Sequence, residues 1–433
     1  MTSIQRTHRD LFFSLLAQGL PAVIALVCIP ILLKHYGIER FGLLTFFWVL
    51  LNWISFLDLG ISRTLTKTLA EDKTILSIEA KKILKASALV IFIMSGIGVC
   101  ILIFLQQWIL NNYLTISPEI LSESKNSLYA IAACFPALLF FSFCKSAIEG
   151  KRHFKEANKM QFVVGISNYA APLLAILFTN RLDAALCLFS ITRWLLLFWS
   201  ISKIRKIFSL EWLWEKLISS DYFQLFRSGI WFALLTIINP LLIYLDRFLV
   251  SNYIPMSELA YYTTPFEIVT RFWLIPTAIT RILFPIFSAE RGAINTKTIQ
   301  AFRNGLLWIG GITIPTGLIL SFWSRSFFEI WLNKHFSENS GLILPILIFG
   351  VIINCLNWIP FTFIQTSKHI RWTVYIPLAE LILFLILFFP LVSSYGSLGA
   401  AIAWSLRLVF DALIWFGICG FLYLQQKNSK DND

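Results

Sequence analysis

The stretch ASALVIFIMSGIGVCILIFL, Ala86–Leu105, decides the class of fold. It carries no charged side chain over about 20 residues, the length that an α-helix needs to cross roughly 30 Å of hydrocarbon at about 1.5 Å per residue. The strands of a transmembrane barrel are shorter and alternate between polar and apolar side chains. This segment therefore predicts a membrane-spanning helix.

Similar stretches recur along the whole chain. Of its 433 residues, 57% are apolar and 14% are charged, against about 45–50% and about 25% in soluble domains. This composition excludes a soluble enzyme, a nucleic-acid-binding protein and a disordered scaffold. We expect an all-α integral membrane protein with about twelve transmembrane helices in two six-helix bundles. The predicted spans are Leu11–Leu33, Phe41–Ile61, Ala86–Leu105, Leu128–Ile148, Gln161–Phe178, Leu182–Ile201, Gly229–Val250, Ala260–Phe287, Leu306–Phe322, Leu342–Phe361, Trp372–Phe389 and Gly399–Leu422.

The longest internal connection, Ser202–Arg227, follows the sixth span. Its basic residues stand beside Trp212 and Trp214, a combination typical of a segment that lies in the membrane interface. We therefore expect an N-terminal bundle at residues 1–220, which ends in this cytoplasmic linker at about 202–227, and a C-terminal bundle at residues 221–433. Transporters with two lobes are built from such repeats.

Basic residues set the predicted orientation. With the N-terminus in the cytoplasm, the cytoplasmic segments hold 24 of the 36 Lys and Arg residues and the external segments hold 6. This bias follows the positive-inside rule and places both termini in the cytoplasm. It also accounts for most of the net charge of +12, so the basicity gives no reason to expect a nucleic-acid partner.

Charged side chains inside the spans are the candidate functional residues, because each costs about 2.5–3.5 kcal/mol at the centre of a membrane helix. Lys145, Asp58 and Arg247 lie near helix ends, where long side chains reach the interface. The charged residues nearer mid-depth are Arg193, Glu267, Arg271, Glu380, Arg407 and Asp411.

Two pairs have the spacing of neighbours on one helix face. Glu267 and Arg271 are four residues apart, as are Arg407 and Asp411, so each pair can form an ion pair within its helix. A structural ion pair between packed helices and a charged cavity wall are both compatible with this spacing. Arg193 has no acidic residue at helical spacing.

The eighth span favours the cavity interpretation. On an ideal helix, Glu267, Arg271 and Arg281 fall within an arc of roughly 80°. Pro265 and Pro276 interrupt the same span, and broken membrane helices are tolerated where they line a cavity. Since arginine stays protonated and offers a planar fork of donors, a cavity lined by arginines suits an anion, and phosphate in particular.

The predicted sites follow from these positions. The predicted substrate-binding residues are Arg193, Arg271, Arg281, Arg407 and Lys145, and the predicted coupling or ion-pair residues are Glu267, Asp246, Asp411, Glu380 and Asp58. Polar residues within or beside spans serve either helix–helix hydrogen bonds or ligand contacts; they are Gln18, Asn52, Asn239, Asn354, Asn357 and Gln365.

Several signals of chemistry are missing from the sequence. It has no glycine-rich phosphate loop and no nucleotide-binding fingerprint. The seven cysteines fall inside apolar stretches without metal-type spacing, so we expect no disulfide framework. We predict no catalytic residue, no metal and no cofactor, and hence a transporter rather than an enzyme.

The layout of the chain resembles the polysaccharide-transporter branch of the multidrug/oligosaccharidyl-lipid/polysaccharide (MOP) exporter superfamily, and in particular the Wzx-type O-antigen flippases. The residues that carry the resemblance are Phe56, Asp58, Leu59, Gly60 and Arg63, then Tyr244, Leu245, Asp246, Arg247 and Phe248, then Tyr261, Tyr262, Pro276, Ala278 and Pro285. Related lipid II flippases carry an arginine cluster in the first helices, whereas the first span here offers only Gln18.

The resemblance implies a bacterial inner-membrane protein that moves an undecaprenyl-pyrophosphate-linked oligosaccharide from the cytoplasmic to the periplasmic face. It implies two bundles around a cationic cavity that opens alternately to each side, with coupling to protons or Na⁺. Its implied partners are the lipid-linked oligosaccharide, the bilayer and other polysaccharide-assembly membrane proteins. A multidrug exporter of the same superfamily and a membrane glycan polymerase or ligase are the alternatives. The first alternative is disfavoured by six basic against five acidic residues inside the spans.

Overall fold

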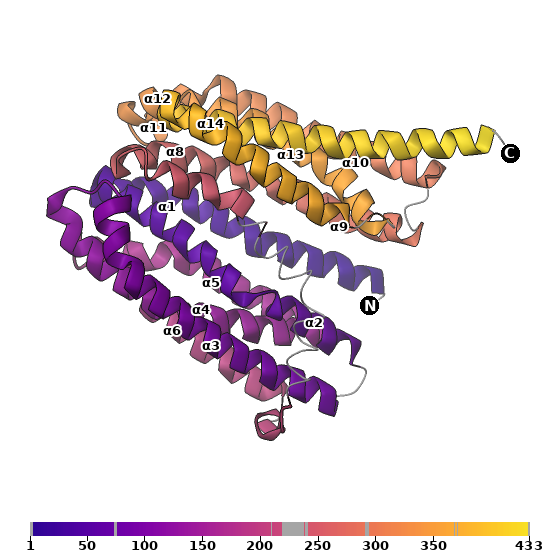
Figure 1. Cartoon of the computed structure of the whole chain (residues 1–433), viewed down its shortest axis with the longest axis horizontal. Coiled ribbons are helices and arrows are strands. Elements are labelled where there is room, and N and C mark those ends of the chain that lie inside the picture. Colours follow the sequence, from indigo (N-terminus) through magenta and orange to yellow (C-terminus); the bar gives the residue numbers. More distant parts are fainter. Residues whose placement is uncertain are drawn as a thin grey trace. The chain divides into compact units, whose positions relative to one another are not determined.

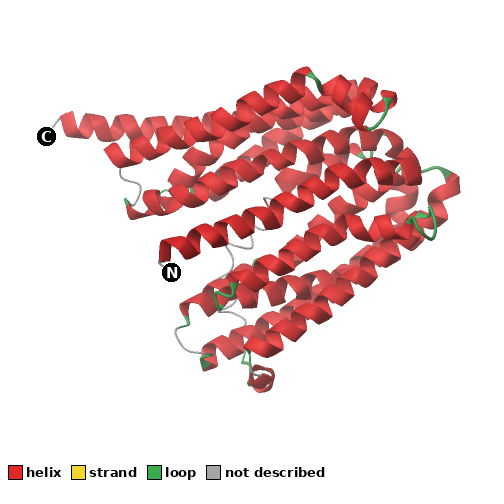
Figure 2. Cartoon of the chain, turned by 180° about the vertical axis from the view of Figure 1, so that it is seen from behind, coloured by secondary structure: helices red, strands yellow, loops and turns green. Residues whose placement is uncertain are grey.

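The computed structural model describes residues 3–72, 76–208, 210–218, 238, 241–290, 294–367, 369 and 371–431. Within these ranges the chain is helical and has no strand (Figure 2). The chain divides into two compact units, Met1–Ser257 and Glu258–Asp433. The predicted boundary at residues 220 and 221 falls on residues outside the described ranges, so it stays a prediction.

The first unit holds the helices coloured indigo to magenta in Figure 1. They are α1 (Ser3–Trp53), α2 (Ile61–Glu71), α3 (Ile78–Trp108), α4 (Pro118–Gly150), α5 (Phe154–Ala175) and α6 (Leu182–Ile207), with short turns at Ile54–Asp58, Ile109–Tyr113 and Leu210–Trp214 and a helical stretch at 241–250.

In the first unit, α4 packs against α6, α3 and α2, and α1 packs against α5. Small side chains along α4 allow this close approach, among them Ala137 and Ala147, which are fully buried. Cys134, Ala171 and Phe189 form a core cluster between α4, α5 and α6. Leu51, Leu138 and Leu188 pack against this cluster.

The second unit contains the helices coloured red to yellow in Figure 1. They are α8 (Met256–Val269), whose first two residues still belong to the first unit, the 3₁₀ turn η4 (Thr270–Trp273), α9 (Leu274–Ala289), α10 (Thr296–Phe322), α11 (Ser324–Trp331), α12 (Lys334–Ser340), α13 (Ile343–Thr366) and α14 (Trp372–Asp431). Helix α13 is central, because it packs against α14, α10 and α9.

The predicted spans are recovered as helices that are long and apolar enough to cross a membrane. Eight such helices occur among the described residues. They account for ten predicted spans because α1 and α14 each contain two, separated at Gly37 (φ 76°) and Gly396 (φ 55°). Glycine adopts such positive φ angles without the strain that a Cβ would cause. The fifth span corresponds to α5, and half of the seventh lies outside the described residues.

The outward faces agree with a lipid environment. Large apolar side chains such as Phe104 and Phe322 are each 84% exposed in the isolated chain. A water-soluble monomer rarely shows so many exposed apolar side chains. Because an α-helix satisfies its own backbone hydrogen bonds, these faces can lie directly against hydrocarbon.

Candidate functional site

Arg193 is a deeply buried charge of the first unit, and no residue that the structure describes forms an ion pair with it. It lies on α6 and is 3% exposed. Its Nη1 donates to Ser167 Oγ at 3.1 Å, and its Nη2 donates to Asn168 Oδ1. The guanidinium carbon lies 4.3 Å from the centre of the Phe189 ring. Its Nε is buried and has no hydrogen-bond partner in the described ranges.

Among the described residues, the acceptors of the hydrogen bonds from Arg193 are neutral hydroxyl and amide oxygens, and none of these residues pairs its positive charge with a carboxylate. Burying an ion in this way costs several kcal/mol unless a counter-charge is present. The site therefore has an electrostatic preference for an anion.

Lys145 and Asp58, also in the first unit, each have a partner close to them in the sequence. Lys145 Nζ donates to Gln161 Oε1 at 2.8 Å and lies 3.8 Å from Glu149 Oε1. Asp58 accepts from Ser62 Oγ at 2.5 Å and from Ser62 N at 3.3 Å, at the start of α2. Asp58 thus precedes the N-cap residue Gly60 and accepts a hydrogen bond from a backbone N–H in the first turn of α2.

Asp246 and Arg247 are both buried in the helical stretch at 241–250, at 1% and 3% exposure. The Arg247 guanidinium carbon lies 5.2 Å from the centre of the Tyr244 ring. Asn239, which the sequence places one turn or more before Asp246, lies outside the described residues, as do the side chains of residues 3–22, including Gln18.

In the second unit, the eighth predicted span is interrupted, as predicted. The turn η4 separates α8 from α9 between Pro265 and Pro276. Arg271 lies in this turn, and its Nη2 is 3.0 Å from Glu267 Oε2. The two side chains are 34% and 22% exposed, so this predicted i,i+4 ion pair forms at an accessible position. Trp273 Nε1 donates to Asn354 Oδ1 at 2.9 Å and ties the turn to α13.

Arg281 lies two turns into α9 and is exposed. It lines a pocket of about 290 Å³ between α9 and α13. The other lining residues are Thr280, Phe284, Trp358, Phe361, Thr362 and Gln365. Arg281 therefore opens onto a cavity, whereas Arg193 is enclosed by the helices of its own unit.

Glu380, Arg407 and Asp411 form a buried network in the second unit. Arg407 Nε lies 3.4 Å from Glu380 Oε1, and these side chains are only 3% and 6% exposed. Asp411 accepts from Asn357 Nδ2 and from Trp415 Nε1, each at 2.7 Å. The predicted partner of Arg407 was Asp411, and the structure adds Glu380, from the first half of α14, as its ion-pair partner.

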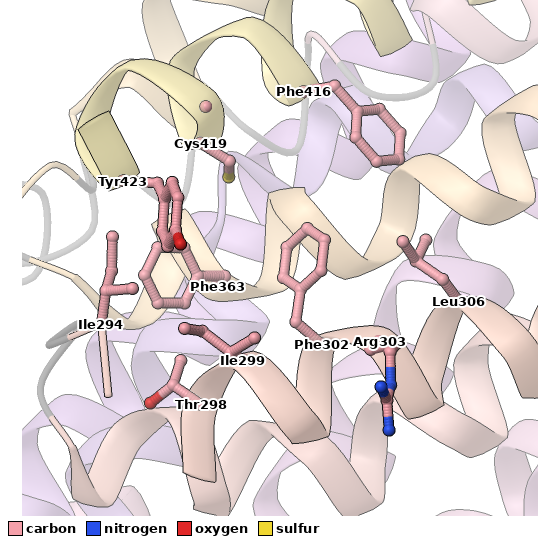
Figure 3. Close-up of a pocket in the computed structure, with 11 residues that line it drawn as sticks. Ile294, Thr298, Ile299, Phe302, Arg303, Leu306, Phe363, Phe416, Cys419 and Tyr423 are labelled. Carbon is pink, nitrogen blue, oxygen red and sulfur yellow. The ribbon is translucent and has the colours of Figure 1, made fainter. Parts of the chain in front are cut away.

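A second pocket of the same unit, of about 390 Å³, lies between α10, α13 and α14 (Figure 3). The rings of Phe302, Phe363, Phe416 and Tyr423 line it, and Arg303 is its one charged lining residue. Its apolar lining makes it suited to hydrocarbon rather than to a polar solute.

The structure thus brings some predicted residues together and leaves others apart. Glu267 lies with Arg271, and Glu380 lies with Arg407 and Asp411. In the first unit, Arg193, Lys145 and Asp58 have separate surroundings. Among the described residues, no group of three or more His, Cys, Asp or Glu side chains is placed to hold a metal ion.

Sequence reasoning missed the residues that hold Arg193. Ser167 and Asn168 lie on α5, about 25 positions away in the sequence. Adjacent polar residues in an otherwise apolar span were the available signal. Sequence reasoning also missed Glu123, which lies between the third and fourth predicted spans and which we would expect in a solvated loop. Glu123 lies in α4, 6% exposed, with two 2.9 Å hydrogen bonds from Arg40.

Comparison of the sequence with known proteins gives two findings. A family model described as "Polysaccharide biosynthesis protein" matches residues 8–289. The chain is 28% identical over 409 residues to a protein of Shigella flexneri named "Putative O-antigen transporter", covering 93% of this chain and 95% of the relative. Both findings concern the sequence alone.

Solved structures share the fold. The chain superposes on the lipid II flippase MurJ in an inward closed conformation with a TM-score of 0.77 and 15% identity, covering 94% of this chain and 87% of MurJ. It superposes on an inward-facing multidrug resistance transporter of the MATE family, in the MOP superfamily, with a TM-score of 0.76 and 10% identity, covering 96% and 99%. The predicted twelve-helix MOP fold is confirmed. These similar proteins are named transporters or flippases, in agreement with the prediction of a transporter.

Proposed function

We propose that this chain, which belongs to the polysaccharide biosynthesis protein family, is a flippase for a lipid-linked oligosaccharide. The proposed substrate is an O-antigen or similar repeat unit on undecaprenyl pyrophosphate. The protein moves it from the cytoplasmic to the periplasmic leaflet of a bacterial inner membrane by alternating access. The name of the Shigella flexneri relative supports an O-antigen substrate.

The observation that carries this proposal is the buried positive charge of Arg193. No carboxylate forms an ion pair with it in the part of the chain that the structure describes, and two neutral acceptors fix its fork of donors. A pyrophosphate headgroup supplies the missing negative charge and the oxygens that match this fork. A cationic drug would be repelled from the same site.

The second unit contributes Arg271 and Arg281, which are both accessible. We assign them to binding of substrate phosphate. Glu267 holds Arg271 at 3.0 Å, so protonation of Glu267 releases the guanidinium for substrate and couples transport to protons. Arg407 serves a different purpose in this proposal, because its buried ion pair with Glu380 already neutralises its charge.

We propose supporting roles for the remaining predicted site residues. Lys145 lies near the predicted cytoplasmic end of α4, where it attracts the headgroup. Asp58, Asp246, Glu380 and Asp411 stay candidates for ion coupling. Other polysaccharide-assembly membrane proteins are the proposed partners, and both chain termini are proposed to be cytoplasmic.

The test is complementation of a strain that lacks this gene, with surface glycan as the readout. Arg271→Ala should abolish surface glycan at unchanged protein level, and Arg271→Lys should restore only part of it because lysine lacks the planar fork. Arg325→Ala is the matched control, since Arg325 is exposed on another helix of the same unit. Wild-type glycan with Arg271→Ala removes this residue from the mechanism.

A multidrug exporter is the second candidate, favoured by the shared fold with a MATE transporter. It predicts that loss of the gene raises drug susceptibility and leaves surface glycan intact. A glycan polymerase is separated by glycan length, because a polymerase mutant still displays single repeat units outside and a flippase mutant displays none.

A further inference from the structure

The pocket of about 290 Å³ between α9 and α13 has the mixed lining that carbohydrates require. We infer that it is a saccharide subsite, which takes one pyranose ring of the cargo, the ring next to the diphosphate. This inference rests on the proposed function, because it names the part of that substrate which this cavity recognises. The pocket is smaller than the roughly 300–1,000 Å³ cavities that enclose drug-sized ligands, in keeping with a single ring.

Three aromatic side chains supply the apolar part of the lining, namely Phe284, Trp358 and Phe361. A pyranose presents C–H groups on its ring faces, and these pack against the electron-rich face of an aromatic ring. Phe361 is fixed by an edge contact with Trp415, with ring centres 5.3 Å apart. The aromatic wall is therefore held in place before any ligand arrives.

The polar part of the lining has capacity for new hydrogen bonds. Within the described residues, neither Trp358 Nε1 nor the Gln365 side-chain amide has a hydrogen-bond partner, and both side chains are half-buried. Half-buried polar groups of this kind are satisfied by water or by a ligand. An amide offers two donors and one acceptor oxygen, which suits a pair of neighbouring sugar hydroxyls.

Two threonines in the pocket offer hydrogen-bond acceptors. Thr280 Oγ1 donates to Pro276 O at 2.7 Å, and Thr362 Oγ1 donates to Trp358 O at 2.6 Å. Because each hydroxyl proton is used by the backbone, each oxygen is left as an acceptor. Sugar hydroxyl groups can donate to these oxygens and accept from the amide. The pocket thus offers donors and acceptors on an aromatic floor.

Arg281 lines the same pocket and joins this subsite to the diphosphate. A guanidinium beside a sugar pocket binds a phosphate attached to that sugar with charge-assisted hydrogen bonds. In the cargo the first sugar is bonded directly to the diphosphate, and in the pocket Arg281 and the aromatic side chains line the same cavity. The sugar recognised here is therefore the one bonded to phosphate.

The experiment measures binding of soluble short-chain probes to the purified full-length protein in detergent. The probes are geranyl diphosphate and three geranyl diphosphates that carry glucose, galactose or N-acetylglucosamine. Wild-type protein should bind at least one sugar-bearing probe more tightly than geranyl diphosphate. Trp358→Leu and Gln365→Leu should weaken binding of that probe by about three- to tenfold, the range for one aromatic contact or one hydrogen bond. Binding of geranyl diphosphate should stay unchanged.

Trp308→Leu is the matched control, because Trp308 is a tryptophan of the same unit that is 50% exposed and lines neither pocket. Gln365→Leu keeps the side-chain size, so it carries the test if Trp358→Leu does not fold. If geranyl diphosphate itself fails to bind wild-type protein, the flippase proposal is wrong. If it binds and no sugar improves affinity, or if the variants weaken all four probes equally, the saccharide subsite alone is wrong.

Discussion

Replacing Arg193 and Arg407 by glutamine distinguishes a charge kept for a ligand from a charge kept for the fold. Both arginines are 3% exposed. Arg193 is held by neutral acceptors, whereas Arg407 forms an ion pair with the buried Glu380. The same substitution should therefore change the free energy of unfolding much less at Arg193 than at Arg407.

For Arg193→Gln the contributions to the free energy of unfolding offset each other. The substitution removes two hydrogen bonds to a charged group, worth about 1.5–3 kcal/mol each. It also removes a buried charge whose desolvation costs several kcal/mol, and the glutamine amide can donate to the same oxygens. We expect the free energy of unfolding to change by about 1 kcal/mol or less while surface glycan is lost.

For Arg407→Gln the balance is different, because Glu380 is left buried without its counter-charge. Breaking one partner of a buried ion pair costs about 3–5 kcal/mol. The double variant Glu380→Gln/Arg407→Gln removes both charges and should recover most of that loss. The pair therefore predicts a strongly non-additive double-mutant cycle.

The assay is the thermal unfolding midpoint of the purified proteins in one detergent, followed by tryptophan fluorescence, with surface glycan measured in the complemented deletion strain. Arg193→Gln should unfold close to the wild type and display no glycan. The reasoning is refuted if Arg193→Gln unfolds as early as Arg407→Gln, or if it displays wild-type glycan at equal protein level.

Two further predictions concern stability alone. A Cβ at Gly350 would lie 2.8 Å from Ser405 Oγ. Gly350→Ala should therefore push α13 away from α14 and lower the free energy of unfolding by about 1–3 kcal/mol. Gly311→Ala is the control, because Gly311 has open space around it, and it should leave the free energy of unfolding unchanged. Lys203 Nζ, 2.8 Å from Glu156 Oε2, lowers the pKa of Glu156 outside the predicted spans. Because that pKa is depressed, the pair contributes its full stabilisation above the ordinary carboxyl pKa of about 4.3 and loses it as the pH falls through the lowered pKa. Glu156→Gln should therefore cost under about 1 kcal/mol at pH 7 and progressively less in acid.

The sequence was sufficient for features that depend on local pattern. The apolar stretches gave the helices, and Pro265 and Pro276 marked the break at η4. The i,i+4 spacing gave the ion pair between Glu267 and Arg271, because residues four apart on a helix are neighbours whatever surrounds them.

Features that depend on tertiary packing could not be read in the same way. Glu380 is 27 positions from Arg407 and meets it because α14 changes direction at Gly396. Ser167 and Asn168 reach Arg193 because α5 packs on α6. Gln365 was one of several polar residues near span ends, and only the packing of α9 on α13 shows that it lines a cavity. Partners on different helices leave no periodic trace in the sequence.

The 3₁₀ turn η4 has a mechanical consequence for the second unit. A 3₁₀-helix advances by about 120° and about 2.0 Å per residue, whereas an α-helix advances by about 100° and about 1.5 Å. If Thr270–Trp273 rewound as α-helix, these four residues would shorten by about 2 Å and would swivel α9 by about 80° relative to α8. Such a screw displacement would carry Arg281 around the helix axis while Glu267 stayed in place. The winding of the turn η4 therefore sets the angle, around the helix axis, between Glu267 on α8 and Arg281 on α9.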